Sequence, residues 1–349
     1  MGLSMKNNKL ILLVLIFLNF NGCYKTELVR GPDYNIYIFA EYSDWDQLNP
    51  VLSEVFNRTI RTPQKEFHFN LVHVNPDSFQ YSLPQKQLIF LASLESKGSI
   101  ADIVKRAVNK PGREEKVKSG ESFLFKNTDQ WGREQLNLIM ISTTISKLEK
   151  LIRENSDLIY GTMLEHQQKV VDRFMYRRSE NKEASDALLE KYLWKVKVQH
   201  DYRLAIEDSA GQFVFLRRRI PERWMFVKWF ENSDRNEITE EWYLDMRDSI
   251  GVKYYGGDTV NRKYTSSNEI NFLGKWCLKI EGLWQNEEKV AGGPFVAYAF
   301  YDDNSRRTYV MDCSVFAPDQ EKVPLLDQLN AMARTFKTII EVVREETGG

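Results

Sequence analysis

One run of residues near the middle of the chain constrains the fold more than any other. The segment Trp224-Met225-Phe226-Val227-Lys228-Trp229-Phe230 is apolar at every position except Lys228. A strand with one solvent-exposed face alternates apolar and polar residues, whereas this run is apolar on both faces. We therefore expect a central strand that is covered on both sides. Hydrophobic residues make up 42% of the chain and aromatic residues 13%, which indicates a folded globular protein.

Strand and helix patterns occur in both halves of the chain. In the first half they predict strands at 35–40, 66–74, 87–92, 121–126 and 136–142, and helices at 99–108 and 143–178. In the second half they predict strands at 202–206, 212–220, 223–230, 272–284, 295–301 and 308–316, helices at 239–249 and 325–343, and a loop at 251–268. We expect an α+β protein of two domains, each a mostly antiparallel sheet packed with helices.

A charged stretch at 177–191 is the best division between these domains. It is rich in Glu, Lys, Asn and Ser and has few apolar residues before Leu188-Leu189. We expect a signal peptide at 1–22, a tether at 23–33, an N-terminal α+β domain at 34–178, a linker segment at 179–201 and a C-terminal α+β domain at 202–349.

The start of the chain has the composition of an export signal. Lys6 and Lys9 precede the apolar run 10–18, and Gly22 comes before a single cysteine, Cys23. This arrangement resembles the signal of bacterial lipoproteins, in which the cysteine is acylated and becomes the mature N-terminus. The apolar run is too short to span a membrane, which takes about 20 residues. A secretory signal without lipid and a buried core strand are the alternatives.

A lipidated Cys23 predicts attachment to a membrane of the cell envelope. No Asp follows Cys23 as an inner-membrane retention signal, and Glu27 is the nearest acidic residue, so we expect the periplasmic face of the outer membrane. The formal net charge of −1 gives no general attraction to nucleic acid. The expected partners are the membrane, through the lipid, and an envelope protein or a glycan.

Cys277 and Cys313 are the other two cysteines of the chain. An oxidising envelope compartment permits a disulfide between them. Strand alternation groups Cys277 with Lys275 and Lys279, but groups Cys313 with Met311, so the two thiols belong to opposite faces of a sheet. We expect no bridge between them.

Four motifs in the second half resemble those of a known family. They are Phe213-Val214-Phe215-Leu216-Arg217-Arg218, the segment 279–284 (KIEGLW), the segment 292–298 (GGPFVAY) and the segment 315–319 (VFAPD) with Lys322. They are similar to the motifs of domain-of-unknown-function family 4837, although Phe215 stands where the family often has Trp. The resemblance implies an envelope lipoprotein with no assigned activity. The order of elements in this half also resembles the photosystem P-subunit and Ran-binding type of fold.

Signatures of catalysis and metal binding are missing from the sequence. The four histidines have no metal-ligand spacing, and no Gly-x-Ser-x-Gly elbow occurs. Gly292-Gly293-Pro294 lacks the Gly-Lys-Ser/Thr ending of a phosphate loop. We therefore predict no catalytic residue, no metal and no cofactor.

The candidate ligand site consists of Arg218, Trp284, Gly292 and Gly293. Arg218 shares strand parity with apolar residues, and Trp284 and Gly293 are expected at one end of a hairpin. An aromatic floor, exposed backbone N–H groups and one positive charge suit an anionic or glycan ligand. In the alternative interpretation, Trp284 fills the core, the glycines relieve crowding and Arg218 pairs with a carboxylate.

These observations favour a non-enzymatic envelope lipoprotein that binds a ligand or partner through its C-terminal sheet. A hydrolase acting on cell-wall or glycan material is one alternative, and an assembly factor for envelope proteins is another. A cleft with two carboxylates would favour the hydrolase, whereas an aromatic surface would favour binding.

Overall fold

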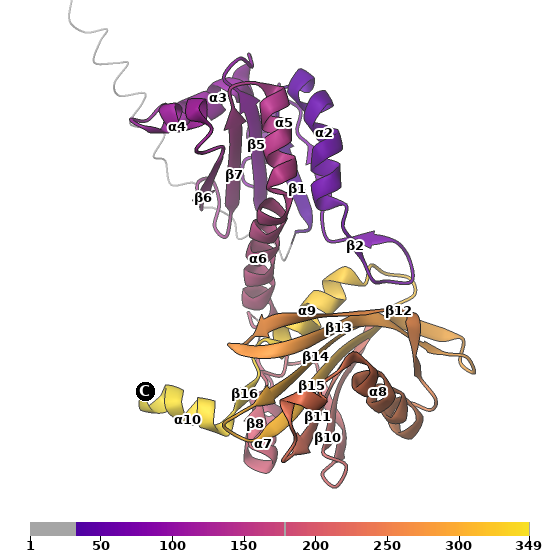
Figure 1. Ribbon diagram of the computed structural model, residues 1–349. Coiled ribbons are helices and arrows are strands. Elements are labelled where there is room, and N and C mark those ends of the chain that lie inside the picture. The colour runs from indigo at the N-terminus through magenta and orange to yellow at the C-terminus, as the bar shows by residue number, and fades with distance from the viewer. Residues whose placement is uncertain (1–32, 178, 349) are drawn as a thin grey trace, which may run out of the picture. The chain divides into compact units, whose positions relative to one another are not determined.

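The computed structural model describes residues 33–177 and 179–348, which form two compact units (Figure 1). Among the described residues, the N-terminal unit contains 33–50 and 71–154, and the C-terminal unit contains 51–70, 155–177 and 179–348. Helix α2 (Tyr42–Phe56) runs across the division at residue 50. The predicted signal peptide, Cys23 and the tether as far as residue 32 lie outside the described residues.

The N-terminal unit is built on a five-stranded sheet of order β4-β1-β5-β7-β6. Its strands are β1 (Asn35–Phe39), β4 (Asn70–His73), β5 (Gln87–Ser93), β6 (Leu124–Thr128) and β7 (Leu136–Ser142). Its other elements are the 3-10 helix η2 (Phe79–Ser82) and the helices α3 (Ser99–Val108), α4 (Arg113–Ser119) and α5 (Ile145–Glu154). The strand β1 pairs with β5 in parallel, β5 pairs with β7 in parallel, and β6 is antiparallel to β7.

The central pairs of this sheet therefore differ from the mostly antiparallel arrangement expected for the first half. The physical reason is burial, because every residue of β5 and of β7 is buried. Continuous apolar runs are typical of parallel strands covered on both faces. The connection from β5 to β7 is long enough to hold α3 and α4, as a parallel crossover requires.

The C-terminal unit is built on a seven-stranded sheet of order β12-β13-β14-β15-β11-β10-β9. The strands are β9 (Arg203–Asp208), β10 (Phe213–Arg219), β11 (Glu222–Glu231), β12 (Thr259–Phe272), β13 (Lys275–Asn286), β14 (Ala291–Asp302) and β15 (Arg307–Phe316). All neighbouring pairs are antiparallel, as predicted for this half.

Helices cover both faces of this sheet. The helices α7 (Lys182–Tyr192) and α9 (Val323–Ala333) pack on one face, and α8 (Glu240–Tyr254) packs on the other. The unit also contains α6 (Ser156–Met175), α10 (Ile339–Thr347) and the 3-10 helix η3 (Arg235–Glu237). Two short pairs complete the unit, β2 (Thr59–Ile60) with β3 (Glu66–Phe67), and β8 (Trp194–Lys195) with β16 (Lys337–Thr338).

The prediction that residues 224–230 form a central, doubly covered strand is confirmed. The strand β11 lies between β10 and β15. Met225 and Val227 pack in a cluster with residues of α7 and α9, whereas Trp224 and Phe226 pack in a cluster with residues of α8. We call these two sides of the sheet the α9 face and the α8 face.

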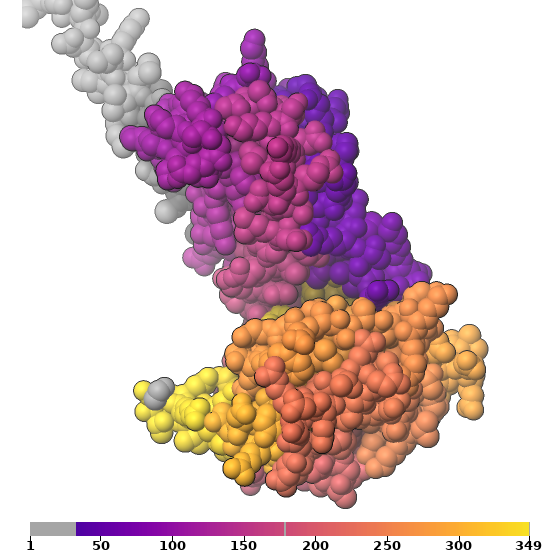
Figure 2. Space-filling view, viewed as in Figure 1, coloured from indigo at the N-terminus to yellow at the C-terminus, as the bar shows by residue number. Residues whose placement is uncertain are grey.

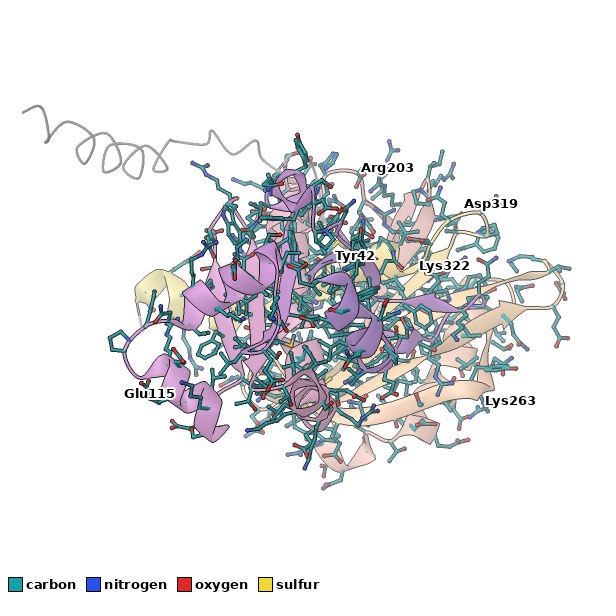
Figure 3. The ribbon with its side chains drawn as sticks, turned by 90° about the horizontal axis from the view of Figure 1, so that it is seen from above. Tyr42, Glu115, Arg203, Lys263, Asp319 and Lys322 are labelled. Carbon is teal, nitrogen blue, oxygen red and sulfur yellow. The ribbon has the colours of Figure 1, made fainter. Side chains whose placement is uncertain are left out.

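Two expectations about connecting segments differ from the structure. Residues 179–201, expected as a linker, contain α7 and β8, and Leu188, Tyr192 and Trp194 are buried in the α9-face cluster. The second part of the expected loop 251–268 belongs to the edge strand β12, on which Lys263 is exposed (Figure 3). The polar composition of these two segments led to the expectation of a linker and a loop. An edge strand and a helix with one buried side need only a few apolar residues, so they have a similar composition.

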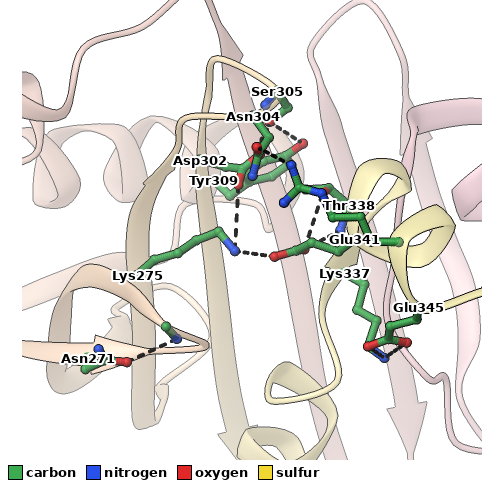
Figure 4. Close-up of polar contacts among 12 residues, drawn as sticks. Asn271, Lys275, Asp302, Asn304, Ser305, Tyr309, Lys337, Thr338, Glu341 and Glu345 are labelled. Carbon is green, nitrogen blue, oxygen red and sulfur yellow. Dashed lines mark hydrogen bonds and ion pairs between the residues drawn. The ribbon is translucent and has the colours of Figure 1, made fainter. Parts of the chain in front are cut away.

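Polar contacts attach α10 to the sheet (Figure 4). Thr338 and Glu341 form a capping box at the start of α10. Lys275 on β13 bonds to Glu341 and lies 3.7 Å from Asp302 on β14. In the space-filling view, α10 is yellow and the long strands of the same unit are orange (Figure 2).

Both described cysteines are free and buried, so the expectation of no disulfide is confirmed. The reason is different from the predicted one, because Cys277 and Cys313 belong to the same α9-face cluster. Cys277 pairs with Phe300 on β14, whereas Cys313 pairs with Val296, four residues away along the same strand. At about 3.4 Å per residue, this offset of roughly 14 Å is beyond the reach of a disulfide.

Candidate ligand-binding cavity

The structure does not bring the four predicted site residues into one site. Trp284 on β13 is only 4% exposed, and its Nε1 donates a hydrogen bond of 3.3 Å to the Val315 carbonyl. A Cβ added at Gly293 would lie 1.9 Å from the same carbonyl oxygen, and one added at Gly292 would lie 2.9 Å from the Trp284 carbonyl oxygen. Trp284 therefore fills the core and the glycines give room to neighbouring backbone, as in the alternative interpretation.

Arg218 lies on the opposite side of the sheet from Trp284. It shares the α9 face with Val214 and Leu216, whereas Trp284 packs on the α8 face. Its Nη1 is 2.9 Å from the Asp201 carboxylate. Arg218 thus has a protein partner, and the sheet separates it from any ligand that contacts Trp284.

A cavity of about 660 Å³ lies on the α8 face of the same sheet. This volume is within the range of small-molecule sites, about 300–1,000 Å³. Residues of β9, β10 and β11, the C-terminal end of α8 and the ends of β13, β14 and β15 contribute to its lining. Six of the lining side chains are aromatic: Phe215, Trp224, Tyr254, Tyr255, Trp284 and Phe316. We call it the aromatic cavity.

The aromatic side chains contact one another in a continuous wall. The ring centroids of Trp224 and Trp284 are 5.3 Å apart, and those of Trp284 and Phe316 are 6.0 Å apart. Tyr255 connects this wall to Phe215 at 5.1 Å. Such tilted ring pairs stabilise the packing, and they hold broad apolar faces in fixed positions around the cavity.

Three buried polar atoms in the lining have no hydrogen-bond partner among the described residues. They are Nε of Arg217, Nε1 of Trp224 and the hydroxyl oxygen of Tyr255. Arg217 and Trp224 are directly opposite each other on β10 and β11, so their side chains are neighbours. An unpaired buried polar group costs about 1–3 kcal/mol. A ligand that offers acceptors to these groups would recover that free energy.

The Tyr255 hydroxyl is a donor at ordinary pH. Desolvation by burial raises its pKa well above the usual value, although the nearby Arg247 guanidinium opposes this effect. The phenol therefore keeps its proton. Because indole and guanidinium N–H groups are also donors, all three unpartnered groups in the lining residues are donors.

The charged groups of the cavity balance one another. Arg217 donates to the Glu222 carboxylate, and the two side chains form an ion pair. Lys289 donates to the Tyr255 carbonyl at 2.7 Å, and Asp258 accepts from Asn286 at 2.7 Å. Two cations and two carboxylates leave no net charge in the lining, so the cavity does not select an ion.

The turn that follows α8 positions Tyr255. Gly251 approaches Asp258 so closely that a Cβ at Gly251 would lie 1.7 Å from the Asp258 carbonyl oxygen. Asn286 also donates to the Gly256 carbonyl at 3.1 Å, which joins the β13–β14 turn to the α8–β12 turn. These contacts fix the end of α8 against the rim of the cavity.

Sequence patterns contained a signal for part of this site. Arg217 alternates with Phe213 and Phe215 on the α8 face, so the same parity that places Arg218 beside apolar residues does so for Arg217 as well. Tyr255 had no such signal, because it directly follows the last residue of α8 and its position depends on the turn. The cavity itself depends on contacts between strands that are far apart in the sequence.

The described ranges contain neither a metal-binding cluster nor a membrane-spanning helix. No group of three or more His, Cys, Asp or Glu side chains there is arranged to hold a metal ion. His73 bonds through Nε2 to the Ala40 carbonyl at 3.0 Å and stacks on Trp45. None of the helices in this part of the chain has the length and apolar character that crossing a membrane requires.

Two family models match the chain. Residues 181–335 match the family described as "Domain of unknown function (DUF4837)", which confirms the resemblance carried by the sequence motifs. Residues 30–176 match the family described as "Domain of unknown function (DUF8532)". The two matches are separated by residues 177–180, whereas the two compact units divide at residue 154. None of the curated proteins matches this chain.

Several solved structures are similar to part of the chain. The Ran-binding protein Mog1p of Saccharomyces cerevisiae matches 42% of this chain and 90% of its own, with 13% identity and a TM-score of 0.30. LpqN, involved in cell envelope biogenesis of Mycobacterium tuberculosis, matches 41% of this chain and 82% of its own, with 11% identity and a TM-score of 0.29. A Bacteroides thetaiotaomicron protein matches 42% and 45%, with 9% identity and a TM-score of 0.25. At these TM-scores the matches say nothing about function.

Proposed function

We propose that this protein is a lipid-anchored envelope protein that binds a glycan in the aromatic cavity. The observation that carries the proposal is the combination of an aromatic wall with three buried, unpartnered donor groups. The C–H faces of sugars pack on aromatic rings, and their hydroxyl and acetamide oxygens accept hydrogen bonds. The balanced charges of Arg217, Glu222, Asp258 and Lys289 favour a neutral sugar over an anion.

The binding test uses N-acetylglucosamine oligosaccharides as probes for the full-length chain in detergent. The double variant Trp224→Phe/Tyr255→Phe removes one indole N–H and one phenol O–H but keeps an aromatic ring at each position. Each lost hydrogen bond is worth about 0.5–1.5 kcal/mol, so the affinity should fall by roughly 5- to 150-fold. Titration calorimetry of both proteins measures this change.

A matched control separates the cavity from general effects on aromatic residues. The double variant Trp276→Phe/Tyr264→Phe makes the same chemical changes in the same unit, at positions outside the aromatic cavity. It should bind as the unmodified chain does. Equal affinities for the cavity variant and the unmodified chain, or no binding of the oligosaccharides at millimolar concentration, would contradict the proposal.

The hydrolase is a second candidate, because two carboxylates, Glu222 and Asp258, line the same cavity. Both have protein partners: Arg217 bonds to Glu222, and Asn286 bonds to Asp258. We expect the oligosaccharides to be recovered intact after incubation with the protein. Shortened products detected by mass spectrometry, and their loss in Glu222→Gln, would favour the hydrolase instead.

The anchor at Cys23 has its own test. A fatty-acid analogue supplied to cells that export the protein should label the unmodified chain but not Cys23→Ala. Fractionation of the labelled cells should place the protein in the outer membrane. Equal labelling of both chains would show that the lipid is absent or attached elsewhere.

A further inference from the structure

A second cavity, of about 550 Å³, lies in the N-terminal unit between α3, the start of α4 and one end of β6 and β7. Its lining includes three cationic side chains, Arg106, Lys110 and Arg113, and no carboxylate. This composition is opposite to that of the aromatic cavity, where charges are balanced. We call it the basic cavity.

The three cations have no carboxylate partner in the described part of the chain. Arg113 donates a long hydrogen bond of 3.4 Å to the Ala107 carbonyl and lies over the Phe125 ring, 5.5 Å from its centroid. Arg106 and Lys110 are exposed and form no ion pair there. Glu115 on α4 is also exposed, and it does not line the cavity (Figure 3). Three uncompensated cations around one cavity attract an anion.

A buried acceptor in the same cavity points to a further ligand group. Asn137 on β7 is 0% exposed, and its Nδ2 donates to Oε1 of Gln135 at 3.2 Å and Oε1 of Gln130 at 3.4 Å. These bonds fix the amide, and its Oδ1 has no partner among the described residues. A fully ionised phosphate or carboxylate group has acceptors only, so this oxygen needs a separate donor such as a hydroxyl group.

Trp131 gives the basic cavity an aromatic side as well. Its ring centroid is 5.5 Å from that of Phe90, and both side chains line the cavity. The cavity therefore combines cations for an anionic group, an acceptor for a hydroxyl group and an indole face for an apolar surface. A sugar that carries a phosphate or a carboxylate has all three.

We propose that the basic cavity binds an anionic sugar. The phosphate or carboxylate pairs with Arg106, Lys110 and Arg113, a sugar hydroxyl donates to Asn137 Oδ1, and the sugar ring packs against Trp131. This site is separate from the aromatic cavity and does not depend on the function proposed for it. Phosphate and carboxylate share the required charge, so the experiment includes both.

The test compares four probes on the full-length chain in detergent by titration calorimetry: glucose 6-phosphate, glucuronate, glucose and inorganic phosphate. At least one of the two anionic sugars should bind at least about tenfold more tightly than glucose and than inorganic phosphate, since each lacks one part of the recognised chemistry. The double variant Arg106→Gln/Lys110→Gln should weaken that binding by at least about tenfold. Both residues are exposed, so these substitutions leave the fold intact.

The matched control is Lys97→Gln/Lys126→Gln, which removes two exposed cations of the same unit outside the cavity. It should retain the affinity of the unmodified chain. If neither anionic sugar binds, or if both double variants lose affinity equally, the site is not the basic cavity. If inorganic phosphate binds as tightly as glucose 6-phosphate, the sugar part of the proposal is wrong.

Discussion

The buried ion pair between α8 and the central sheet gives the sharpest stability prediction. Arg247 and Asp312 are both 0% exposed, and Arg247 Nε lies 2.9 Å from Asp312 Oδ2. The same carboxylate accepts from the hydroxyls of Tyr243 at 2.7 Å and Ser314 at 2.6 Å. Desolvation lowers the pKa of Arg247, but the Asp312 carboxylate more than offsets this, so the pKa is raised and the guanidinium stays charged.

Removing one charge leaves the other buried without its partner. Arg247→Met and Asp312→Asn should each lower the free energy of unfolding by about 3–5 kcal/mol, the usual cost of breaking a buried pair. Asp312→Asn keeps an oxygen that accepts from a hydroxyl, so its cost comes mainly from the unpaired guanidinium. The double variant contains no buried charge, and we expect it to lie within about 2 kcal/mol of the unmodified chain.

Urea unfolding followed by tryptophan fluorescence measures these values. The signal reports mainly on the C-terminal unit, because all tryptophans except Trp45 and Trp131 belong to it. Arg262→Met is the control, since Arg262 forms exposed ion pairs with Asp245 and Glu241 of α8 and should cost about 0–1 kcal/mol. Single variants that cost less than about 1 kcal/mol, or a double variant equal to the sum of the singles, would refute the reasoning.

Four further outcomes follow from local geometry and burial. Gly161 lies inside α6, and a Cβ added there would meet no neighbouring atom within 4 Å, so Gly161→Ala should stabilise the protein by about 0.5–1 kcal/mol in the same urea assay. Gly293→Ala should destabilise it by more than about 2 kcal/mol, because the new Cβ would overlap the Val315 carbonyl oxygen; an unchanged midpoint would show that the strands separate easily. Burial raises the pKa of Cys277 to about 12, so this thiol should resist iodoacetamide at pH 8 in the folded protein and react in urea. The Cys277 thiol ionises at about pH 8.5 in the unfolded chain and at about pH 12 in the folded protein. The free energy of unfolding should therefore decrease between these two pH values, and Cys277→Ser should reduce this decrease.

The sequence was most informative where a residue's own strand decides its environment. The doubly apolar run at 224–230 correctly predicts a central strand, because burial of both faces leaves a mark on every position. The antiparallel order of the second half follows from short turns such as the one between β14 and β15. In the first half, β5 and β7 were recognised as strands, but their parallel pairing depends on the path of the chain through α3 and α4.

The alternation of side chains along a strand was not enough to predict which residues form the site. It places Arg217 and Arg218 on different faces, but both faces of this sheet are apolar, so parity does not tell which arginine meets a ligand. The position of Arg247 among Tyr243, Leu244 and Ile250 did carry a signal, because helical spacing puts it on the buried side of α8. Its partner Asp312 lies on β15, and no local sequence pattern predicts a contact between two segments so far apart in the chain.

The arginine pair at 217 and 218 also bears on how proteins of this kind can diverge. Successive residues of β10 lie in different environments, since Arg218 pairs with Asp201 on the α9 face and Arg217 lines the aromatic cavity on the α8 face. Substitutions on one face leave the side chains of the other in place. Ligand preference can therefore drift through changes at Arg217, Trp224 and Tyr255 while α7 and α9 keep their packing, and relatives with the same fold are expected to recognise different molecules.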